Sequence, residues 1–285
     1  MDYLVMQIIN GIVIGSVYAL IALGLNLIWS ITDVPDFSQG AIYVIAAYVG
    51  FFAVTWAKLP FLASIFVAMC VGAAIAFTCE KMLFRRWRGT THHIQLLCAI
   101  ALFFLMSNLA VVFWTGKAKF MPSYLSGKIP LLGFYVTYER LVVIAMAGIL
   151  FGLVYFFITK TKMGKSIQAA SQDKETAEMM GINIDTVNSV VFALGGALSS
   201  TAAVLTAPLY SVYPTMGDLP LLKSLVVVIL GGFGSVGGVL VCGLGLGIVE
   251  SLGGFYISSA YQHGYSFFVL ILVLLFRPKG LFGRM

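Results

Sequence analysis

The chain consists of long apolar runs separated by short polar intervals. A transmembrane helix needs about 20 predominantly apolar residues, because the hydrocarbon core of a bilayer is about 30 Å thick. The runs extend over Leu4–Trp29, Ala41–Trp56, Phe61–Cys79, Ile94–Trp114, Leu141–Ile158, Val187–Ala207, Leu221–Val249 and Phe255–Phe276. The pattern predicts an all-α polytopic membrane protein with about eight or nine transmembrane helices, some of them broken or re-entrant.

The composition agrees with a membrane environment. The chain has 60% hydrophobic and 10% charged residues and a mean hydropathy of +1.01, whereas soluble domains carry about 25% charged residues. The net charge of +6 is spread thinly between apolar runs, so it indicates orientation in the bilayer rather than a nucleic-acid-binding face. We expect residues 1–285 to form a single transmembrane domain in contact with lipid, with no nucleic-acid partner.

Positive charge predicts which loops face the cytoplasm. Arg85, Arg86 and Arg88 form the densest basic cluster, directly after the third run, and cytoplasmic loops carry an excess of Lys and Arg. The loop after the fourth run must then lie on the outer side, although it contains Lys117, Lys119 and Lys128. These lysines run against the tendency but are dispersed over a longer segment.

The segment Lys160–Ile182 is the only extended polar interval in the sequence. It combines charged positions with alanines and methionines, and Gly181 is placed to end a helix. We predict two short helices at the membrane surface, within about residues 160–186, that present Ala and Met side chains to a groove on another protein. The alternative is a solvated loop that happens to be helical.

The first run carries a stripe of small residues, Gly11, Gly15 and Ala19. Small residues at this spacing allow helices in lipid to approach closely, so this face is expected to pack against protein. Asn10 and Asn26 lie in the same run. They are expected either to hydrogen-bond to a neighbouring helix or to line a pathway.

Two breaks interrupt the apolar pattern. Ser30–Gly40 contains Pro35 and two aspartates, and it is predicted to be either an interfacial loop or a break in a helix that lines the translocation path. Leu230–Gly238 reads LGGFGSVGG. A helix break there would place the basic tail, with Arg277, Lys279 and Arg284, on the cytoplasmic side. One break in each half is what an internal structural repeat would produce.

No catalytic, metal or nucleotide site is indicated. The apolar runs hold no nucleophile with a nearby base, and no H-E-x-x-H pattern. Gly164-Lys165-Ser166 lacks the first Gly of a phosphate-binding loop, and Gly232, Gly234 and Gly237 lack the βαβ context of a dinucleotide site. The acidic candidates for ion coupling, Asp33, Asp36 and Glu250, lie at breaks or ends of runs, so the energy for transport is expected to come from elsewhere.

Several segments together resemble a known family. They are INGIVIGSVYALIALGLNLIW at Ile9–Trp29, DFSQGAIYVIAAYV at Asp36–Val49, AASQDKETAEMMGINIDTVNSVVFALGGALSSTAAVL at Ala169–Leu205, LGGFGSVGGVLVCGLGLGIVE at Leu230–Glu250 and RPKGLFG at Arg277–Gly283. In this order they resemble the LivH-like permeases of ATP-binding-cassette importers for branched-chain amino acids.

The resemblance implies a type II-like importer permease in the cytoplasmic (inner) membrane of a bacterium or archaeon. Lys165–Gly181 would contain the coupling helices that dock into an ATPase. The partners implied are a second permease subunit, either a related LivM-like chain or a second copy, two cytoplasmic ATPases, and a periplasmic or lipid-anchored substrate-binding protein. The permease would need no cofactor, because ATP and Mg²⁺ bind to the ATPases, and it would not be an enzyme.

The candidate residues form two groups. The coupling candidates are Lys165, Ala169, Asp173, Glu175, Ala177, Glu178 and Gly181. The candidates for the pathway or the helix breaks are Asn10, Asn26, Asp36, Ser38, Gln39, Gly40, Gly231, Gly232, Gly234 and Gly237. The chain departs from the family at Asp36, where Asn is usual, and at Lys165-Ser166, where Arg-Ala is usual.

The function expected is ATP-driven import of branched-chain or other hydrophobic amino acids. The departure at Asp36 keeps urea, short amides and small aromatic or carboxylic compounds as alternative substrates. A stand-alone channel or secondary carrier is the alternative function class. It is disfavoured because it has no use for an amphipathic pair of cytoplasmic helices.

Overall fold

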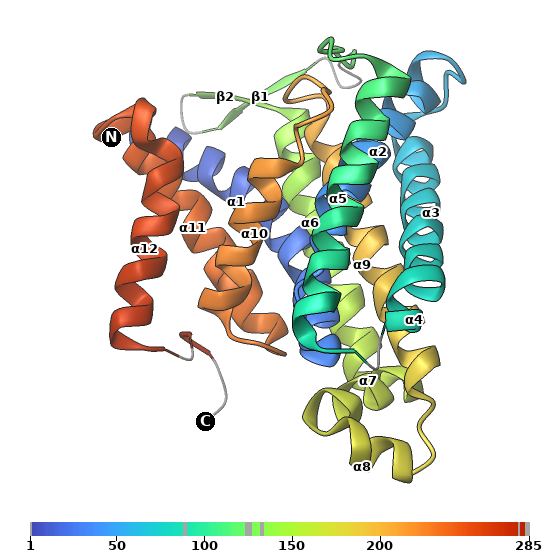
Figure 1. Ribbon diagram of the computed structural model, residues 1–285. Coiled ribbons are helices and arrows are strands. Elements are labelled where there is room, and N and C mark those ends of the chain that lie inside the picture. Colours follow the sequence, from blue (N-terminus) through green and yellow to red (C-terminus); the bar gives the residue numbers. More distant parts are fainter. Residues whose placement is uncertain (1, 88–89, 123–126, 132–133, 279, 283–285) are drawn as a thin grey trace.

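A computed structural model describes residues 2–87, 90–122, 127–131, 134–278 and 280–282. Among these residues the fold is a bundle of long helices with one short β-hairpin (Figure 1). In chain order, the elements are α1 (Asp2–Thr32), α2 (Ser38–Thr55), α3 (Phe61–Cys79), a π-helical turn (Glu80–Phe84), α4 (Arg85–Trp87), α5 (His92–Trp114), β1 (Lys128–Leu131), β2 (Phe134–Thr137), α6 (Tyr138–Lys160), α7 (Lys162–Gln172), α8 (Lys174–Met179), α9 (Ile184–Thr206), α10 (Asp218–Gly231), α11 (Val236–Tyr256), a 3₁₀ turn (Ser259–Tyr261) and α12 (Gln262–Phe276).

Eight helices in the described part of the chain are long and apolar enough to cross a membrane. They are α1, α2, α3 together with the π-helical turn and α4, α5, α6, α9, α11, and α12 together with the 3₁₀ turn before it. Helix α10 has 14 residues, so it extends over only about 21 Å at 1.5 Å per residue. The described residues therefore form eight candidate spans and one shorter helix, in agreement with the predicted polytopic helical class.

The two ends of the bundle differ in their loops and charge. Helices α7 and α8 project from one end together with the C-terminal segment, while the N-terminus and the β-hairpin lie at the other end (Figure 1). Arg85 and Lys160 lie where helices reach the α7–α8 end, which is therefore the cytoplasmic side. Arg277 follows α12 at the same end, as predicted from the second break. Arg88, Lys279 and Arg284 lie outside the described residues.

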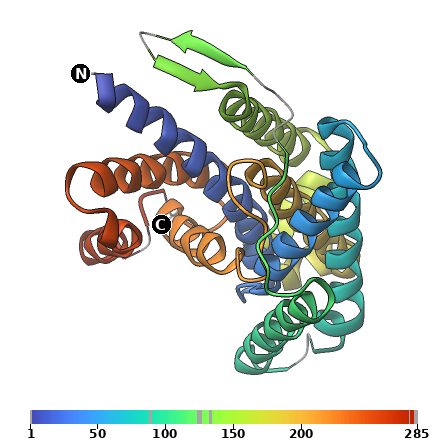
Figure 2. The same ribbon diagram turned by 90° about the horizontal axis from the view of Figure 1, so that it is seen from above.

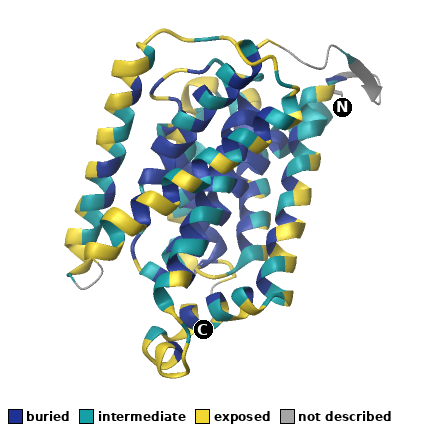
Figure 3. Ribbon diagram, turned by 90° about the vertical axis from the view of Figure 1, so that its right-hand side faces the viewer, coloured by how far each residue is buried: buried dark blue, intermediate teal, exposed yellow. Residues whose placement is uncertain are grey.

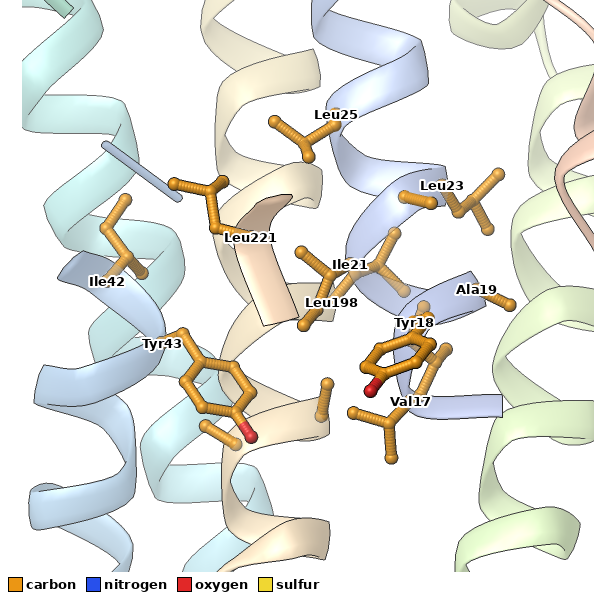
Figure 4. Close-up of a cluster of buried hydrophobic side chains, with 14 of the residues drawn as sticks. Val17, Tyr18, Ala19, Ile21, Leu23, Leu25, Ile42, Tyr43, Leu198 and Leu221 are labelled. Carbon is orange, nitrogen blue, oxygen red and sulfur yellow. The ribbon is translucent and has the colours of Figure 1, made fainter. Parts of the chain in front are cut away.

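The interior is formed by α1, α2 and α9. In each of these three spans, 72% of the most apolar 18-residue stretch is buried. The corresponding share is only 17% in α5 and 6% in the span that contains α12. Viewed along the bundle, α5 and α12 lie at the periphery (Figure 2), and buried residues concentrate between the central helices (Figure 3). The core includes Ile21, Ile42 and Leu198 from these three helices (Figure 4). The peripheral helices therefore present their apolar side chains to lipid or to another subunit.

Helix α1 crosses α11 at very short range. A Cβ added to Gly15 would lie 2.6 Å from the carbonyl oxygen of Gly243, and one added to Gly11 would lie 2.6 Å from the Cα of Ile248. From the other side, a Cβ on Gly247 would lie 2.3 Å from the carbonyl oxygen of Gly11. The predicted small-residue stripe of the first run is confirmed, and its protein partner is α11.

The segment between α9 and α10 folds inward. Val212 and Met216 are buried, and α10 already begins at Asp218. The backbone N–H groups of Lys119 and Val212 each donate to the other's carbonyl at 2.8 Å, which holds the segment against the chain after α5. The chain therefore turns inward before α10 begins.

Candidate functional site

The polar interval folds into two capped helices at the cytoplasmic end. Thr161 Oγ1 accepts a hydrogen bond from the Gly164 backbone N–H at 3.0 Å and so begins α7. Asp173 separates α7 from α8 and accepts from the backbone N–H and the hydroxyl of Thr176, at 3.0 and 2.7 Å. These side-chain caps satisfy backbone donors that a helix start leaves free. The two-helix prediction for this interval is therefore confirmed.

Helix α8 ends in a Schellman motif. The backbone N–H of Ile182 donates to the carbonyl of Ala177 at 3.1 Å, and that of Gly181 donates to Glu178 at 2.9 Å. Gly181 has a φ of +86°, a left-handed conformation that glycine adopts without steric cost. Gly181 therefore caps the helix, as its position in the sequence predicted.

The exposed surface of α7 and α8 is formed by methionines and charges, not by alanines. Met179 and Met180 are 86% and 80% exposed, and Lys165, Glu175 and Glu178 are exposed as well. Ala177 is buried and Ala169 is half-buried. The expectation that alanines are presented to a partner was wrong for Ala177, because its small side chain faces the core of the chain itself.

An ion pair joins α8 to the first break. Lys174 Nζ lies 2.7 Å from Asp33 Oδ2, and both side chains are partly exposed, so the pair contributes at most about 1 kcal/mol. Its value is positional, because it connects the projecting helices to the turn between α1 and α2.

The first break is a tight turn whose polar groups point inward. Asp36 accepts hydrogen bonds from the Ser38 backbone N–H at 2.9 Å and from Gln39 Nε2 at 3.1 Å. Gln39 Oε1 in turn accepts from the Ser199 hydroxyl at 2.7 Å. Asp36, Ser38, Gln39 and Ser199 are all buried, so this network fixes the start of α2 against α9. A carboxylate suits position 36 because both of its oxygens accept.

Close packing follows directly after this network. A Cβ added to Gly40 would lie 2.8 Å from a methyl carbon of Leu221. The break joins two antiparallel spans at the cytoplasmic end (Figure 1). Of the two expected forms it is closer to a loop between spans, although it is buried rather than interfacial.

The second break joins α10 to α11. Gly232 and Gly234 have φ values of +80° and +76°, and a Cβ on Gly231 would lie 2.8 Å from the Val239 nitrogen. The Gly234 backbone N–H donates to Asn26 Oδ1 at 3.0 Å, so buried Asn26 holds this turn in place. Gly237 has neither a positive φ nor a close neighbour, because nothing lies within 4 Å of an added Cβ.

The outer half of the bundle holds two adjoining cavities of about 340 and 410 Å³. Both are lined by Val13, Ile14, Leu209, Tyr210 and Gln262, and we call them together the outer groove. Asn10 and Arg140 line the smaller cavity, where the Arg140 guanidinium donates to Asn10 Oδ1. The larger one, which we call the chamber, is lined by apolar side chains and by Tyr18, Tyr43 and Glu250.

Next to the chamber lies a buried cluster of charges. Lys223 of α10 and Glu250 of α11 form an ion pair, with side chains 0% and 1% exposed. His263 Nδ1 lies 2.8 Å from Lys223 Nζ and 3.3 Å from Glu250 Oε1, and the Ser266 hydroxyl donates to Glu250 Oε2 at 3.3 Å. Buried charges need partners of this kind. The cluster joins α10, α11 and α12.

Comparison with known proteins now decides the family. A family model described as "Branched-chain amino acid transport system / permease component" matches residues 7–276. The chain belongs to this family. Among curated relatives, the permease protein BraD of Pseudomonas aeruginosa is 31% identical, covering 98% of this chain and 95% of the relative.

Other relatives agree. The LivH permease protein of Escherichia coli is 30% identical, covering 99% of this permease and 96% of the relative. A probable LivH protein of Methanocaldococcus jannaschii is 29% identical, covering 96% and 91%. A solved structure titled "PsaBC from Streptococcus pneumoniae in complex with Fab" aligns with a TM-score of 0.52 at 13% identity, covering 95% of this permease and 91% of that chain. The solved structure supports the fold alone.

Sequence reasoning missed the buried charges of the permease. Glu250 was placed at the end of a run, but it lies inside α11 and is buried. Lys223 is the only Lys or Arg between residues 175 and 276, and that isolation within an apolar stretch was the available signal. The two charges of the pair cancel, so the pair does not indicate ion coupling. The interpretation that the energy for transport comes from another source is therefore unchanged.

Replacing Asp173 with alanine should unfold the start of α8 without changing the bundle. The carboxylate accepts both hydrogen bonds from Thr176, and these bonds lower its pKa. The cap should therefore be fully present above about pH 4, the usual pKa of Asp, and should be lost as the pH falls through the lower folded value. Hydrogen exchange of the α8 amides should be several-fold faster in Asp173→Ala. Asp173→Asn, which keeps an acceptor, should exchange like the wild type, and equal exchange in Asp173→Ala would disprove the capping role.

Proposed function

We propose that this chain is the permease subunit of an ATP-driven importer that carries branched-chain or other hydrophobic amino acids across the cytoplasmic membrane. The observation that carries the proposal is the family match over residues 7–276 together with relatives that are named as branched-chain amino acid permeases. The permease itself is not an enzyme, and partner ATPases bind ATP and Mg²⁺ and hydrolyse the nucleotide. Urea, amides and carboxylic compounds are not favoured as substrates, because the relatives described above are named for branched-chain amino acids.

We assign the ATPase contact to α7 and α8. Their outward face combines two exposed methionines with Lys165, Glu175 and Glu178. Methionine is unbranched and polarizable, so it adapts to a groove on a partner. Asp173 and Gly181 shape the two helices through their caps, and Ala169 and Ala177 hold them against the bundle. The Lys174–Asp33 ion pair then connects the proposed ATPase contact to the break before α2, so a movement of α8 would be passed to that turn.

The complete importer would hold two permease subunits, two ATPases and a substrate-binding protein on the outer side. The second permease is proposed to be a related LivM-like chain or a second copy. Residues 1–285 are proposed to act as one permease domain, in which Asn10 borders the pathway and the remaining break residues fix its shape. This assignment is supported by Asn10 lining the outer groove and by Asn26, Asp36 and Gln39 being buried in structural hydrogen bonds.

Charging the exposed methionines should release the ATPases. Met179→Glu with Met180→Glu adds two carboxylates to an apolar contact, and desolvating them should lower ATPase recovery at least tenfold in co-purification from native membranes in mild detergent. His93→Glu is the control, because His93 is also exposed at the cytoplasmic end but lies at the start of α5. Full ATPase recovery with the double variant would remove the docking assignment. A wild type that purifies alone and moves solute without ATP would overturn the importer proposal.

A further inference from the structure

Of the three histidines in the chain, His263 alone lies at the outer end of the bundle. It is the second residue of α12 and its side chain is 56% exposed, whereas His92 and His93 begin α5 at the cytoplasmic end. Histidine is the side chain whose charge ordinarily changes between about pH 5 and pH 8. A proton from the outer side can therefore reach this ring and change its charge.

The Nδ1 atom of His263 lies beside a donor and an acceptor. Lys223 Nζ is 2.8 Å away and Glu250 Oε1 is 3.3 Å away. A lysine ammonium has only donors, so Nδ1 must carry no proton if it is to accept from Lys223. The ring is then neutral, with its proton on Nε2. The observed arrangement is therefore that of a neutral imidazole.

Protonation is incompatible with this arrangement. A protonated imidazole is a donor at both nitrogens, so the hydrogen bond from Lys223 is lost and two positive groups face each other. The charges of Lys223 and Glu250 cancel, and the cluster gains one net positive charge. A proton on Nδ1 can reach Glu250 Oε1 only by competing with Lys223 for that atom.

Burial decides which of the two cations moves. The Lys223 side chain is 0% exposed, whereas that of His263 is 56% exposed. Moving the ring outward keeps its charge in water, while an unpaired charge in the interior is very costly. The protonated His263 ring therefore turns outward, and the Lys223–Glu250 pair stays in place.

The outer end of α12 depends on this contact. Only 6% of the most apolar stretch of its span is buried. Among the described residues, the other α12 side chain that is hydrogen-bonded to α10 or α11 is Ser266, which donates to Glu250 Oε2 at 3.3 Å. Gln262 and His263 both line the chamber. When the ring turns outward, this wall of the chamber is released.

The other ionisable groups around the ring do not ordinarily titrate in this pH range. Lys223 of α10 and Glu250 of α11 are paired with each other, and Asp218 at the start of α10 does not line the chamber. The remaining groups are phenols, whose ordinary pKa is about 10. They are Tyr18, Tyr43, Tyr210 and Tyr213, which line the chamber, and Tyr261 and Tyr265, which flank His263 along the chain.

We propose that His263 is a proton-sensitive latch on the outer side of the chamber. The neutral ring holds the start of α12 against α10 and α11, and protonation releases this end of the helix and widens the chamber. The latch goes beyond the proposed import function, because it is a conformational equilibrium of the permease that needs no ATPase.

The protonation state is tested by solid-state NMR on the permease in lipid nanodiscs with ¹⁵N-labelled histidine. The signal of His263 is identified by its loss in His263→Gln. At about pH 8 it should show Nδ1 without a proton and Nε2 with one, and at about pH 5 both nitrogens should be protonated. A proton on Nδ1 at the higher pH would overturn the latch.

The movement is tested by the distance between spin labels on Tyr261→Cys and Trp56→Cys, with the native cysteines replaced by alanine. Both residues are exposed and lie at the outer ends of α12 and α2. The distance distribution should be narrow at about pH 8 and about twofold broader at about pH 5, because released and held helices coexist. Identical distributions at both values contradict the proposal.

Variants at His263 separate its charge from other effects of pH. His263→Gln keeps an acceptor for Lys223 and does not titrate, so its distribution should be narrow at both pH values. His263→Arg is always charged and should give the broad distribution at both. His93→Gln is the control, because it removes an exposed histidine at the cytoplasmic end and should respond like the wild type. A wild-type response in His263→Gln, or a narrow distribution in His263→Arg, would overturn the latch.

Discussion

Lys223→Met should destabilise the permease by about 3–5 kcal/mol, because it leaves the Glu250 carboxylate buried without its lysine. Lys223 and Glu250 are 0% and 1% exposed in their side chains, so the carboxylate stays largely desolvated when its lysine is removed. Of the groups around the carboxylate, His263 and Ser266 remain, both at 3.3 Å. Three helices meet at this cluster, so its loss should loosen α10, α11 and α12 together.

The double variant Lys223→Met, Glu250→Gln should recover most of that loss, because it leaves no buried charge. Unfolding can be followed in detergent by the labelling of Cys79 and Cys242, which are free and buried in the folded protein. Lys117→Met makes the same substitution at an exposed site and should leave the midpoint unchanged. If the single and double variants unfold at the same temperature, Glu250 does not depend on Lys223 for its stability.

The spans were predictable from the sequence because hydropathy and length are local properties. The stretch Ile94–Trp114 reappears as α5 from His92, and Phe61–Cys79 has the bounds of α3. The side of the membrane on which the C-terminal tail lies was predictable from the charge of Arg277 and from the glycines at Leu230–Gly238. Gly181 was identified as a helix cap because the backbone conformation at a helix end favours glycine. In each of these cases the deciding interaction lies within a few residues of the position predicted.

The parts that were missed depend on contacts between distant residues. Lys223 and Glu250 are 27 residues apart, and their pairing needs the turn at Gly232 and Gly234 to bring α10 beside α11. Met216 is buried only because the chain after α9 folds inward. Ala177 faces the core because of how α8 lies against the bundle, and residue type alone does not specify that. Arg140 is likewise placed on the outer groove by the packing of α6 beside α1.

Gly15→Leu should prevent the bundle from assembling. The nearest atoms to an added Cβ are the carbonyl oxygen of Gly243 at 2.6 Å and the Cα of Leu244 at 2.9 Å. Both are backbone atoms, so no side chain can rotate away, and α1 must move off α11. Overpacking a core typically costs about 1–3 kcal/mol where side chains can adjust, and the cost here should exceed that range.

The measurement is the yield of monodisperse permease on size-exclusion chromatography after extraction in detergent. Gly148→Leu is the matched control, because Gly148 is also helical and an added Cβ would have nothing within 4 Å. That variant should keep the wild-type yield, since leucine forms helices better than glycine by roughly 0.5–1 kcal/mol. A normal yield of Gly15→Leu would show that α1 and α11 can separate without loss of the fold. The low yield that we expect would mean that the whole bundle depends on this crossing, because α1 also packs against α9 and α10 and cannot move off α11 alone.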